Sequence, residues 1–389
     1  MRDTIRAAAG CRFEDIYSLE EQVLGELIEG RYKLLQKIGV GSMGAVFEAE
    51  SLITKIKVAI KLINPSLQNQ HQFRARFERE AFVAENLNSP YCAEVLEFGE
   101  CEDGRLFLVM ELLKGESIDA LLKRERTFGV GKALYFTKQV LKGLVAMHSA
   151  GFIHRDIKPE NIFIHKKEDG QDIAKIVDFG IAKPINTRPE TNEQLTKVGL
   201  VLGTPYYIAP DWMLHDDPDE RTDMYSLTVS LFEMLTGAPP IHDTDNKRIM
   251  SRHLLRNRPA LAEINPTLEY PPELEAFVRK GWSLNRDDRY QSAEEMGSAI
   301  DVLMGDMGLN EDDIRNSLSE SKSSFGTAKK IKERANTTSG LFDFATLQGV
   351  LSVGCLGLLS VLVFGFLFST CNVDDSVSRQ EGVDWWADK

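Results

Sequence analysis

Residues 154–161 read HRDIKPEN and constrain the fold and chemistry of this chain more than any other stretch. They place the carboxylate of Asp156, the ammonium of Lys158 and the amide of Asn161 within six residues. A phosphoryl-transfer site needs such a set: a base for a hydroxyl nucleophile, a cation for the phosphate charge and an oxygen ligand for a metal. Asp178, the first residue of a DFG triplet, follows seventeen residues after Asn161. The two motifs together therefore indicate phosphoryl transfer.

The elements expected on both sides of this loop favour a functional site over an isolated turn. A helix-like run over residues 135–148 precedes the loop, and a hairpin of two short strands, 162–164 and 175–177, follows it. An Asp-x4-Asn pair in isolation would be better explained as an ordinary turn. In this context we expect Asp156 to orient the substrate hydroxyl and Lys158 to neutralise charge on the transferred group.

Asn161 and Asp178 are the candidate metal ligands. Mg²⁺ is a hard ion that takes oxygen ligands and usually binds a substrate phosphate as well. We therefore predict ATP and Mg²⁺ as cofactors, with Mn²⁺ as an alternative ion. The formal net charge of −13 argues against a nucleic-acid partner, which would need a basic face.

A glycine-rich segment, GVGSMG at residues 39–44, follows a strand-like run over 32–38. The pattern GxGxxG alone is weak evidence, because it also marks dinucleotide-binding loops that open a helix. Here β-like alternation continues over residues 45–49, and Lys61 ends the short apolar run VAIK. We therefore expect two strands that cover a nucleotide, with glycine amides and Lys61 at the phosphates. The expected nucleotide contacts from this region are Ile38, Gly39, Val40, Gly41, Ser42, Met43, Gly44, Val46, Ala59 and Lys61.

Lys61 needs an anion to hold it in place when ATP is absent. Residues 72–87 read as a helix with one apolar face. A single glutamate on such a helix is usually a solvated surface charge. The order of the surrounding motifs nevertheless favours Glu80 as the partner of Lys61, with Glu78 and Glu85 as competitors.

The strand-like run LFLVM at residues 106–110 leads into a glycine-bearing linker, which suits a hinge between two lobes. Backbone groups of Glu111 and Leu113 would bond an adenine ring there. The side chain of Met110 would border the same pocket.

Residues 349–368 form a run of twenty residues without a charge, unlike the mixed polar and apolar composition of a soluble domain. About 20 apolar residues span a bilayer as a helix, and a buried core helix seldom lacks a polar face for so long. We predict a transmembrane helix over 347–369. Basic residues precede it and acidic residues follow it, which places the N-terminal side in the cytoplasm and the tail 370–389 outside the plasma (inner) membrane.

With these motifs in this order, residues 32–303 resemble the eukaryotic-like (Hanks-type) serine/threonine protein kinases of the bacterial transmembrane kind. The bacterial character rests on GSMG at 41–44, MYSL at 224–227 and the single C-terminal span. The resemblance implies an α+β, bilobal protein kinase fold that binds ATP in the cleft between its lobes. The implied divisions are an extension (1–31), an N-lobe with one helix (32–110), a mostly helical C-lobe (114–303) and a juxtamembrane linker (304–346).

The resemblance also implies protein substrates with serine or threonine acceptors, and activation by autophosphorylation. Thr204 resembles the residue that bonds the catalytic aspartate and lysine and shapes the substrate groove. Arg155 resembles the arginine that pairs with a phosphate on the activation loop. The candidate acceptors on that loop are Thr187, Thr191 and Thr196, of which we favour Thr196. A homodimer would allow phosphorylation in trans.

Three positions near the end of the activation loop concern the structure of the C-lobe. Asp211 replaces the glutamate of the family's Ala-Pro-Glu, and Arg289 lies where its buried arginine partner is expected. We therefore expect the ion pair to survive with altered geometry. Asp223, expected to brace the backbone of the catalytic loop, is present, and Thr228 stands where a glycine is common.

Three other functions compete with that of a protein kinase. A pseudokinase would bind nucleotide or partners without turnover, but Lys61, Glu80, Asp156, Asn161 and Asp178 fill every expected catalytic position. A small-molecule kinase would not need the segment from Thr204 to Asp211. The acidic tail with its paired tryptophans could instead sense a ligand, although such tryptophans more often rest at a membrane interface.

Overall fold

The computed structural model describes residues 24–41, 44–64, 73–178, 205–213, 218–243, 245–255 and 258–318. Among these residues, no helix is both long enough and apolar enough to cross a membrane. Several predictions concern other parts of the chain and lie outside the described residues: the glycine-loop residues Ser42 and Met43, the threonines Thr187, Thr191, Thr196 and Thr204, and the segment 347–369.

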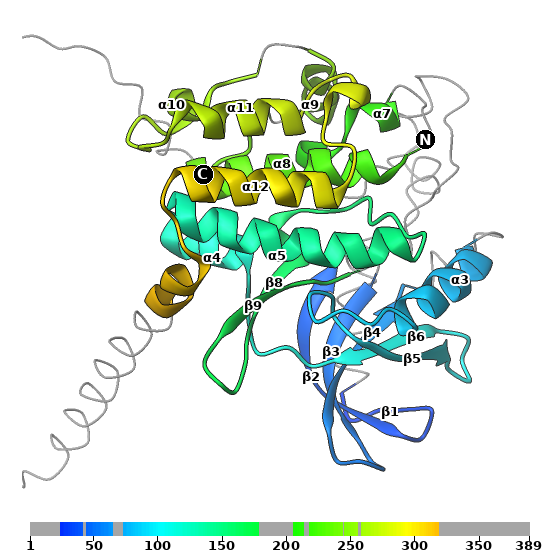
Figure 1. Cartoon of the computed structure of the whole chain (residues 1–389). Coiled ribbons are helices and arrows are strands. Elements are labelled where there is room, and N and C mark those ends of the chain that lie inside the picture. The colour runs from blue at the N-terminus through cyan, green and yellow to red at the C-terminus, as the bar shows by residue number, and fades with distance from the viewer. Residues whose placement is uncertain are drawn as a thin grey trace, which may run out of the picture. The chain divides into compact units, whose positions relative to one another are not determined.

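The N-terminal lobe is an antiparallel sheet with the strand order β1-β2-β3-β4-β6-β5 (Figure 1). Helix α3 (Phe73–Glu85) packs against β5 and confirms the helix predicted over 72–87. The predicted strands around the glycine-rich segment and before the hinge are also confirmed. The strands are β1 (Leu27–Ile28), β2 (Tyr32–Gly41), β3 (Gly44–Ser51), β4 (Lys57–Ile63), β5 (Val95–Glu100) and β6 (Leu106–Glu111).

Alternation along β4 gives this sheet two differently used faces. Val58 and Ile60 belong to a small apolar cluster on one face of the sheet. Ala59 points the other way and joins the larger core, which continues into the C-terminal lobe. Because side chains on a strand alternate with a period of two, Lys61 shares the face of Ala59. Met110, whose Cα pairs with that of Ala59, also belongs to this face.

The C-terminal lobe is mostly helical, with α5 and α8 at its centre (Figure 1). A small sheet of order β7-β8-β9 carries the hairpin predicted after the catalytic loop. Its elements are β7 (Gly115–Ser117), α4 (Ile118–Glu125), α5 (Val130–Ser149), η1 (Pro159–Asn161), β8 (Ile162–Lys166), β9 (Asp172–Ile176), η2 (Pro205–Tyr207), α7 (Pro210–Met213), α8 (Glu220–Thr236), α9 (Asn246–His253), α10 (Leu261–Ile264), α11 (Pro272–Gly281), η3 (Arg286–Asp288) and α12 (Ala293–Asp306).

Side-chain caps fix where several of these helices begin. Ser117, Asp219 and Ser292 each accept a hydrogen bond from a backbone N–H in the first turn of α4, α8 and α12, respectively. Such caps satisfy donors that a helix start leaves without intrahelical partners. Gly237 ends α8 in the left-handed conformation that glycine adopts easily.

The folded unit is longer at both ends than the sequence predicted. Strand β1 pairs with β2, so the sheet begins before residue 32. At the other end, α12 continues to Asp306, and residues 311–318 form a further helix. Leu309, Ile314 and Leu318 pack against the core. The linker was predicted to begin at residue 304, but residues up to Leu318 still belong to the folded unit. Their scattered apolar side chains pack against the core of the C-terminal lobe.

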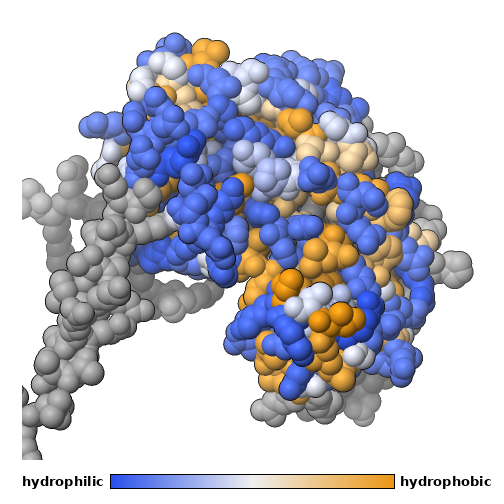
Figure 2. All heavy atoms as spheres, turned by 60° about the horizontal axis from the view of Figure 1, so that its bottom comes forward, coloured by the Kyte–Doolittle hydropathy of each residue, from blue (hydrophilic) through white to orange (hydrophobic). Residues whose placement is uncertain are grey.

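Large hydrophobic residues remain exposed on the N-terminal lobe, among them Leu27, Ile53 and Ile56. Figure 2, which turns this lobe toward the viewer, shows hydrophobic surface gathered over it. Contiguous exposed apolar surface commonly marks an interaction site.

Candidate active site

The buried carboxylate of Asp223, on α8, holds the catalytic loop, which lies between α5 and β8. Asp223 accepts hydrogen bonds from the backbone N–H groups of His154 at 2.9 Å and Arg155 at 2.8 Å. The Nε2 atom of His148 lies 2.9 Å from the same carboxylate and donates to it. The predicted bracing role of Asp223 therefore has a direct structural counterpart.

The environment of Asp223 keeps it ionised although it is fully buried. Burial alone would raise its pKa, but the hydrogen bond from His148 and the favourable charges of His148 and His154 outweigh that effect and lower the pKa. An ionised acceptor forms the stronger hydrogen bonds to backbone N–H groups. Arg155, held by these bonds, has a φ of 64°, a conformation that costs energy for a residue with a side chain.

Two polar residues of the catalytic loop, Lys158 and Asn161, both contact Asp156. The Nδ2 atom of Asn161 donates to the backbone carbonyl of Asp156 at 2.8 Å and to its Oδ2 at 3.0 Å. The Nζ atom of Lys158 lies 3.4 Å from the same Oδ2. Since Asn161 uses its amide nitrogen on Asp156, its amide oxygen remains as the atom that can bind a metal. The loop thus orients the carboxylate of Asp156 beside a cation.

Lys61 and Asp178 meet across the cleft in an ion pair. The side chain of Lys61 is only 9% exposed. Burial would raise the pKa of Asp178, but the charge and hydrogen bond of Lys61 outweigh that effect and lower the pKa. Asp178 has a φ of 62° and, like Arg155, stores backbone strain at the site. Lys61, predicted to contact the phosphates, and Asp178, predicted to bind the metal, therefore lie next to each other in the cleft.

Glu80 lies on α3 and is buried, with 7% of its surface exposed. A buried glutamate is rare unless it is paired. Its charge acts on Arg155: burial lowers the pKa of Arg155, while the carboxylates of Glu80 and Asp223 oppose that shift. Glu80 thus lies near the catalytic loop as well as near the cleft. The pairing of Glu80 with Lys61 stays a prediction.

Strand β2 ends at Gly41 and β3 begins at Gly44, both glycines of the glycine-rich segment. Gly44 has a φ of 154°, and a Cβ atom at this position would lie 1.9 Å from the carbonyl oxygen of Leu62. Only glycine fits this approach of two strands. On β2 the side chains of Ile38 and Val40 are 47% and 45% exposed, which leaves apolar atoms free to cover a planar ring.

The hinge follows β6, and its backbone donors are already partly used. The N–H of Glu111 donates to the carbonyl of Glu94 at 3.0 Å, so the carbonyl of Glu111 is the group left for an adenine ring. The carboxylate of Glu111 accepts from the backbone N–H of Glu94 at 2.8 Å and from the buried ammonium of Lys175. Sequence reasoning missed Lys175, although a lysine within the apolar strand IAKIV was a visible signal.

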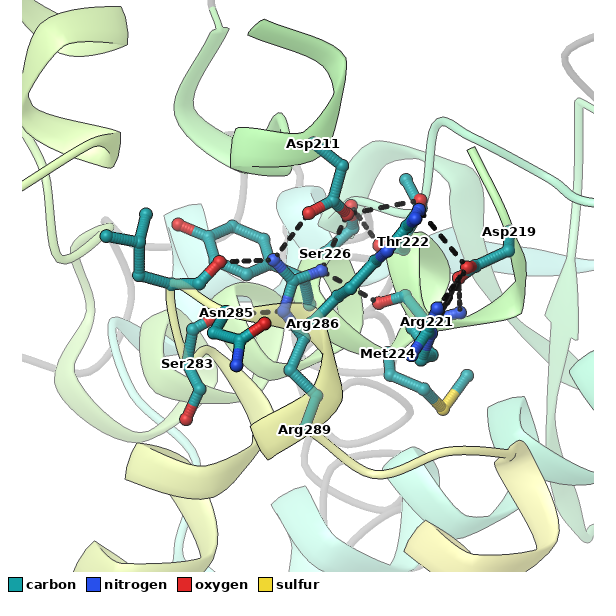
Figure 3. A network of polar contacts seen from close by, with 12 residues as sticks. Asp211, Asp219, Arg221, Thr222, Met224, Ser226, Ser283, Asn285, Arg286 and Arg289 are labelled. Atoms are coloured by element: carbon teal, nitrogen blue, oxygen red, sulfur yellow. Dashed lines mark hydrogen bonds and ion pairs between the residues drawn. The ribbon is translucent and has the colours of Figure 1, made fainter. Parts of the chain in front are cut away.

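Asp211 and Arg289 form a bidentate ion pair in the C-terminal lobe (Figure 3). The two contacts are 2.7 and 2.8 Å long, and the side chains are 4% and 0% exposed. Arg289 also donates to the backbone carbonyls of Ser283 and Leu284, at 2.7 and 3.1 Å. The shorter aspartate therefore still reaches the arginine, as the sequence predicted.

Thr228, at a position where the family commonly has glycine, meets a glycine on the neighbouring helix α11. A Cβ atom on Gly281 would lie 2.1 Å from the Oγ1 atom of Thr228. The hydroxyl of Thr228 donates to the carbonyl of Met224 at 2.7 Å, which satisfies it inside the helix. The missing side chain at Gly281 thus makes room for the extra atoms of Thr228.

The donor set of the cleft fits a hard divalent cation. Asn161 and Asp178 offer an amide oxygen and a carboxylate, the kind of ligands that Mg²⁺ takes. The described residues contain no cluster of three or more His, Cys, Asp or Glu side chains that could hold a metal by themselves. Mg²⁺ at nucleotide sites usually has only one or two protein carboxylates, together with phosphates and water. The residues present therefore fit a metal that binds with its nucleotide.

Comparisons with known proteins agree with this geometry. The family model described as "Protein kinase domain" matches residues 32–299. The chain is 35% identical over 283 residues to serine/threonine-protein kinase pkn3 of Myxococcus xanthus, which covers 73% of this chain and 52% of pkn3. It is 36% identical over 275 residues to serine/threonine-protein kinase PknE of Mycobacterium tuberculosis, which covers 71% of this chain and 46% of PknE. The chain thus spans about half the length of these curated relatives.

A solved structure shares the fold over the same region. The crystal structure of the Mycobacterium tuberculosis PknI kinase domain matches with a TM-score of 0.57 and 25% sequence identity. The match covers 72% of this chain and 98% of that chain.

Proposed function

This chain belongs to the protein kinase family, and on that premise we propose that it is an ATP- and Mg²⁺-dependent serine/threonine protein kinase held at a membrane by residues 347–369. One observation carries the catalytic part of the proposal: Asp156 contacts Asn161 and Lys158, and Asp178 contacts Lys61. The relatives named as serine/threonine-protein kinases support the choice of acceptor.

The residues of the cleft divide the work of phosphoryl transfer among them. Asp156 accepts a hydrogen bond from the substrate hydroxyl and directs its oxygen toward the γ-phosphate. Lys158 and Lys61 compensate the negative charge of the phosphates, Lys158 at the transferred group and Lys61 at the others. Asn161 and Asp178 would hold Mg²⁺, which neutralises phosphate charge when bound. Most of the rate would come from this positioning and electrostatic compensation.

The adenine ring would lie between the apolar residues of the two strands and the hinge. Val46 and Ala59 come from β3 and β4, and Met110 borders the same face of the sheet. The carbonyl of Glu111 and the N–H of Leu113 would bond the edge of the ring. This arrangement selects a purine by shape and by two backbone groups.

Activation would proceed by phosphorylation of the loop between Asp178 and Asp211. Arg155 supports this part of the proposal because it lies half-buried in the catalytic loop and carries a charge that a phosphate on Thr196 could meet. Thr204 would contact Asp156 and Lys158 and shape the groove for the substrate. A homodimer that phosphorylates in trans is consistent with the exposed hydrophobic residues of the N-terminal lobe.

Membrane attachment and orientation rest on the sequence alone. The charge-free run at 349–368 supports the span, and the excess of basic residues before it supports a cytoplasmic kinase domain. In this arrangement the kinase would act on proteins near the inner face of the membrane.

The proposal is tested with the purified full-length chain in detergent, Mg²⁺ and γ-labelled ATP, beside the Asp156→Asn variant. We expect label in the native chain, loss of label in the variant, and phosphate at Thr196 by mass spectrometry. ATP binding by the native chain without any label would refute the kinase and point to a pseudokinase. Label at serine or threonine outside the activation loop alone would refute the proposed mode of activation.

A further inference from the structure

Three buried polar side chains are linked by hydrogen bonds beside the loop that contains η2 (Pro205–Tyr207). Arg258 donates to the hydroxyl of Tyr225 at 2.9 Å, and that hydroxyl lies 2.7 Å from the Nδ1 atom of His253. Their exposures are 6%, 0% and 0%, respectively. Such groups are kept inside a protein only when their hydrogen-bonding partners are arranged for them. This row of hydrogen bonds runs from the guanidinium of Arg258 to the imidazole of His253.

The direction of these hydrogen bonds, from donor to acceptor, decides which ring nitrogen of His253 carries its hydrogen. An arginine has only donors, so the hydroxyl oxygen of Tyr225 accepts from Arg258. Within the described part of the chain, the one acceptor that this buried hydroxyl reaches is Nδ1, so its hydrogen points to Nδ1. The remaining hydrogen of the neutral ring is therefore on Nε2. Burial lowers the pKa of His253 to about 4, and the charge of Arg258 acts in the same direction. The imidazole is therefore neutral at physiological pH and presents Nε2–H as a donor.

The Nε2 atom of His253 has no partner of regular hydrogen-bond geometry among the described residues. The ring does, however, interact with the backbone of Pro205 and Tyr206, and α9, which carries the histidine, packs against that loop. A buried N–H without a good acceptor is unfavourable. A small shift of the loop backbone toward Nε2 would complete the hydrogen bond.

Other contacts hold the last residue of the same loop. The hydroxyl of Ser226 donates to the carbonyl of Tyr207 at 2.8 Å, and the hydroxyl of Tyr207 lies 2.5 Å from Glu233. The two residues directly after Thr204 have other contacts: the N–H of Ile208 donates to the carbonyl of Pro205 at 3.5 Å, and the ring of Tyr206 stacks on His242. Helix α9 packs against the same segment and adds the imidazole of His253 to these contacts. In a protein kinase, the stretch between Thr204 and Asp211 faces the protein substrate.

We propose that His253 is a positioning residue for substrate binding, because its Nε2–H anchors the backbone of Pro205 and Tyr206 in the conformation that receives the protein substrate. This inference rests on the proposed function of the chain as a protein kinase. The anchor acts on binding of the acceptor protein, and none of its contacts involves a residue proposed to bind the nucleotide.

Two conservative substitutions separate the nitrogens of the ring. The amide nitrogen of His253→Gln reaches about as far as Nε2, whereas the amide of His253→Asn reaches only as far as Nδ1. We expect His253→Asn to raise the KM for myelin basic protein about three- to tenfold, which corresponds to one lost hydrogen bond. We expect His253→Gln to keep this KM within about twofold of the native value, and both variants to keep the KM for ATP.

The matched control is Ser230→Ala, which removes a buried hydroxyl of α8 that donates within its own helix, to the carbonyl of Ser226 at 2.9 Å. An equal KM for myelin basic protein in the Asn, Gln and native chains would overturn the inference, and so would an equal rise in Ser230→Ala. A native chain that fails to phosphorylate myelin basic protein would count against the proposed function itself.

Hydrogen exchange provides a second measurement that needs no activity. We expect the amides of Tyr206 and Tyr207 to exchange faster in His253→Asn than in His253→Gln, at equal protection of α8. Equal exchange of the loop in both variants would refute the anchor even in an inactive chain.

Discussion

Replacing Asp211 with asparagine should destabilise the kinase domain severely, because it leaves a buried guanidinium without its carboxylate. Arg289 is 0% exposed and makes two contacts to Asp211, at 2.7 and 2.8 Å. Removal of one partner of such a buried pair typically costs about 3–5 kcal/mol. The backbone carbonyls of Ser283 and Leu284 still accept from Arg289, so we expect a loss near the lower end of this range, about 3 kcal/mol.

The assay is equilibrium unfolding in urea, followed by circular dichroism, for the native chain and Asp211→Asn. Lys123→Met serves as the control, because it breaks an ion pair to Asp119 whose lysine is 75% exposed, and it should cost less than about 1 kcal/mol. Asp211→Glu tests the fit of the shorter acid: an added methylene in this closed site should cost about 1–3 kcal/mol by overpacking. A loss below about 1 kcal/mol for Asp211→Asn would refute the reasoning that this pair is buried and mutually dependent.

Three further outcomes follow from particular contacts. Gly281→Ala should lower the free energy of unfolding by about 1–3 kcal/mol, because its Cβ would collide with Thr228, and Thr228→Ala in the same chain should recover part of that loss; urea unfolding of both variants checks this. Burial raises the pKa of Glu233 from 4.5 to about 7, so its contribution to stability is present below pH 4.5 and is lost as the pH rises toward 7. In Glu233→Gln the unfolding free energy should no longer fall over that window, and an unchanged pH profile would count against the shift. Lys61→Met should abolish phosphorylation and leave the chain folded, because the side chain of Asp178, which loses its partner, is 39% exposed and can be solvated; a cooperative melt together with a phosphorylation assay would decide it.

The sequence predicted that the polar residues of the catalytic loop lie together, because their spacing reflects local structure. The loop from His154 to Asn161 is short, so its carboxylate, ammonium and amide have to lie close together in any fold. The short apolar run that ends at Lys61 predicted a strand beside the glycine-rich segment, and β4 confirms it. Periodicity and local spacing are properties that a single sequence contains.

Contacts between distant segments could not be predicted in the same way. Lys175 reaches Glu111 across sixty-four positions, and its place in an apolar strand shows only that it needs an anion. The polar chain from Arg258 to His253 depends on how α8 and α9 pack, which no local pattern specifies. The boundary at residue 304 was missed for a related reason: Ile314 and Leu318 are too widely spaced among polar residues to indicate a packed face. Tertiary packing decides such contacts, and local propensity does not.

Helix α8 explains why so many polar residues are tolerated at the centre of the C-terminal lobe. Its polar side chains hold two functional segments and one histidine: Asp223 binds the catalytic loop, and Tyr225 contacts His253. Ser226 binds the carbonyl of Tyr207, and Glu233 binds its hydroxyl. A wholly apolar helix would bury as much surface and could be as stable, but it could not fix the catalytic and substrate-binding loops on one rigid element. Because positioning supplies most of the rate in phosphoryl transfer, the proposed kinase reaction explains the polar composition of this helix better than the stability of the fold does.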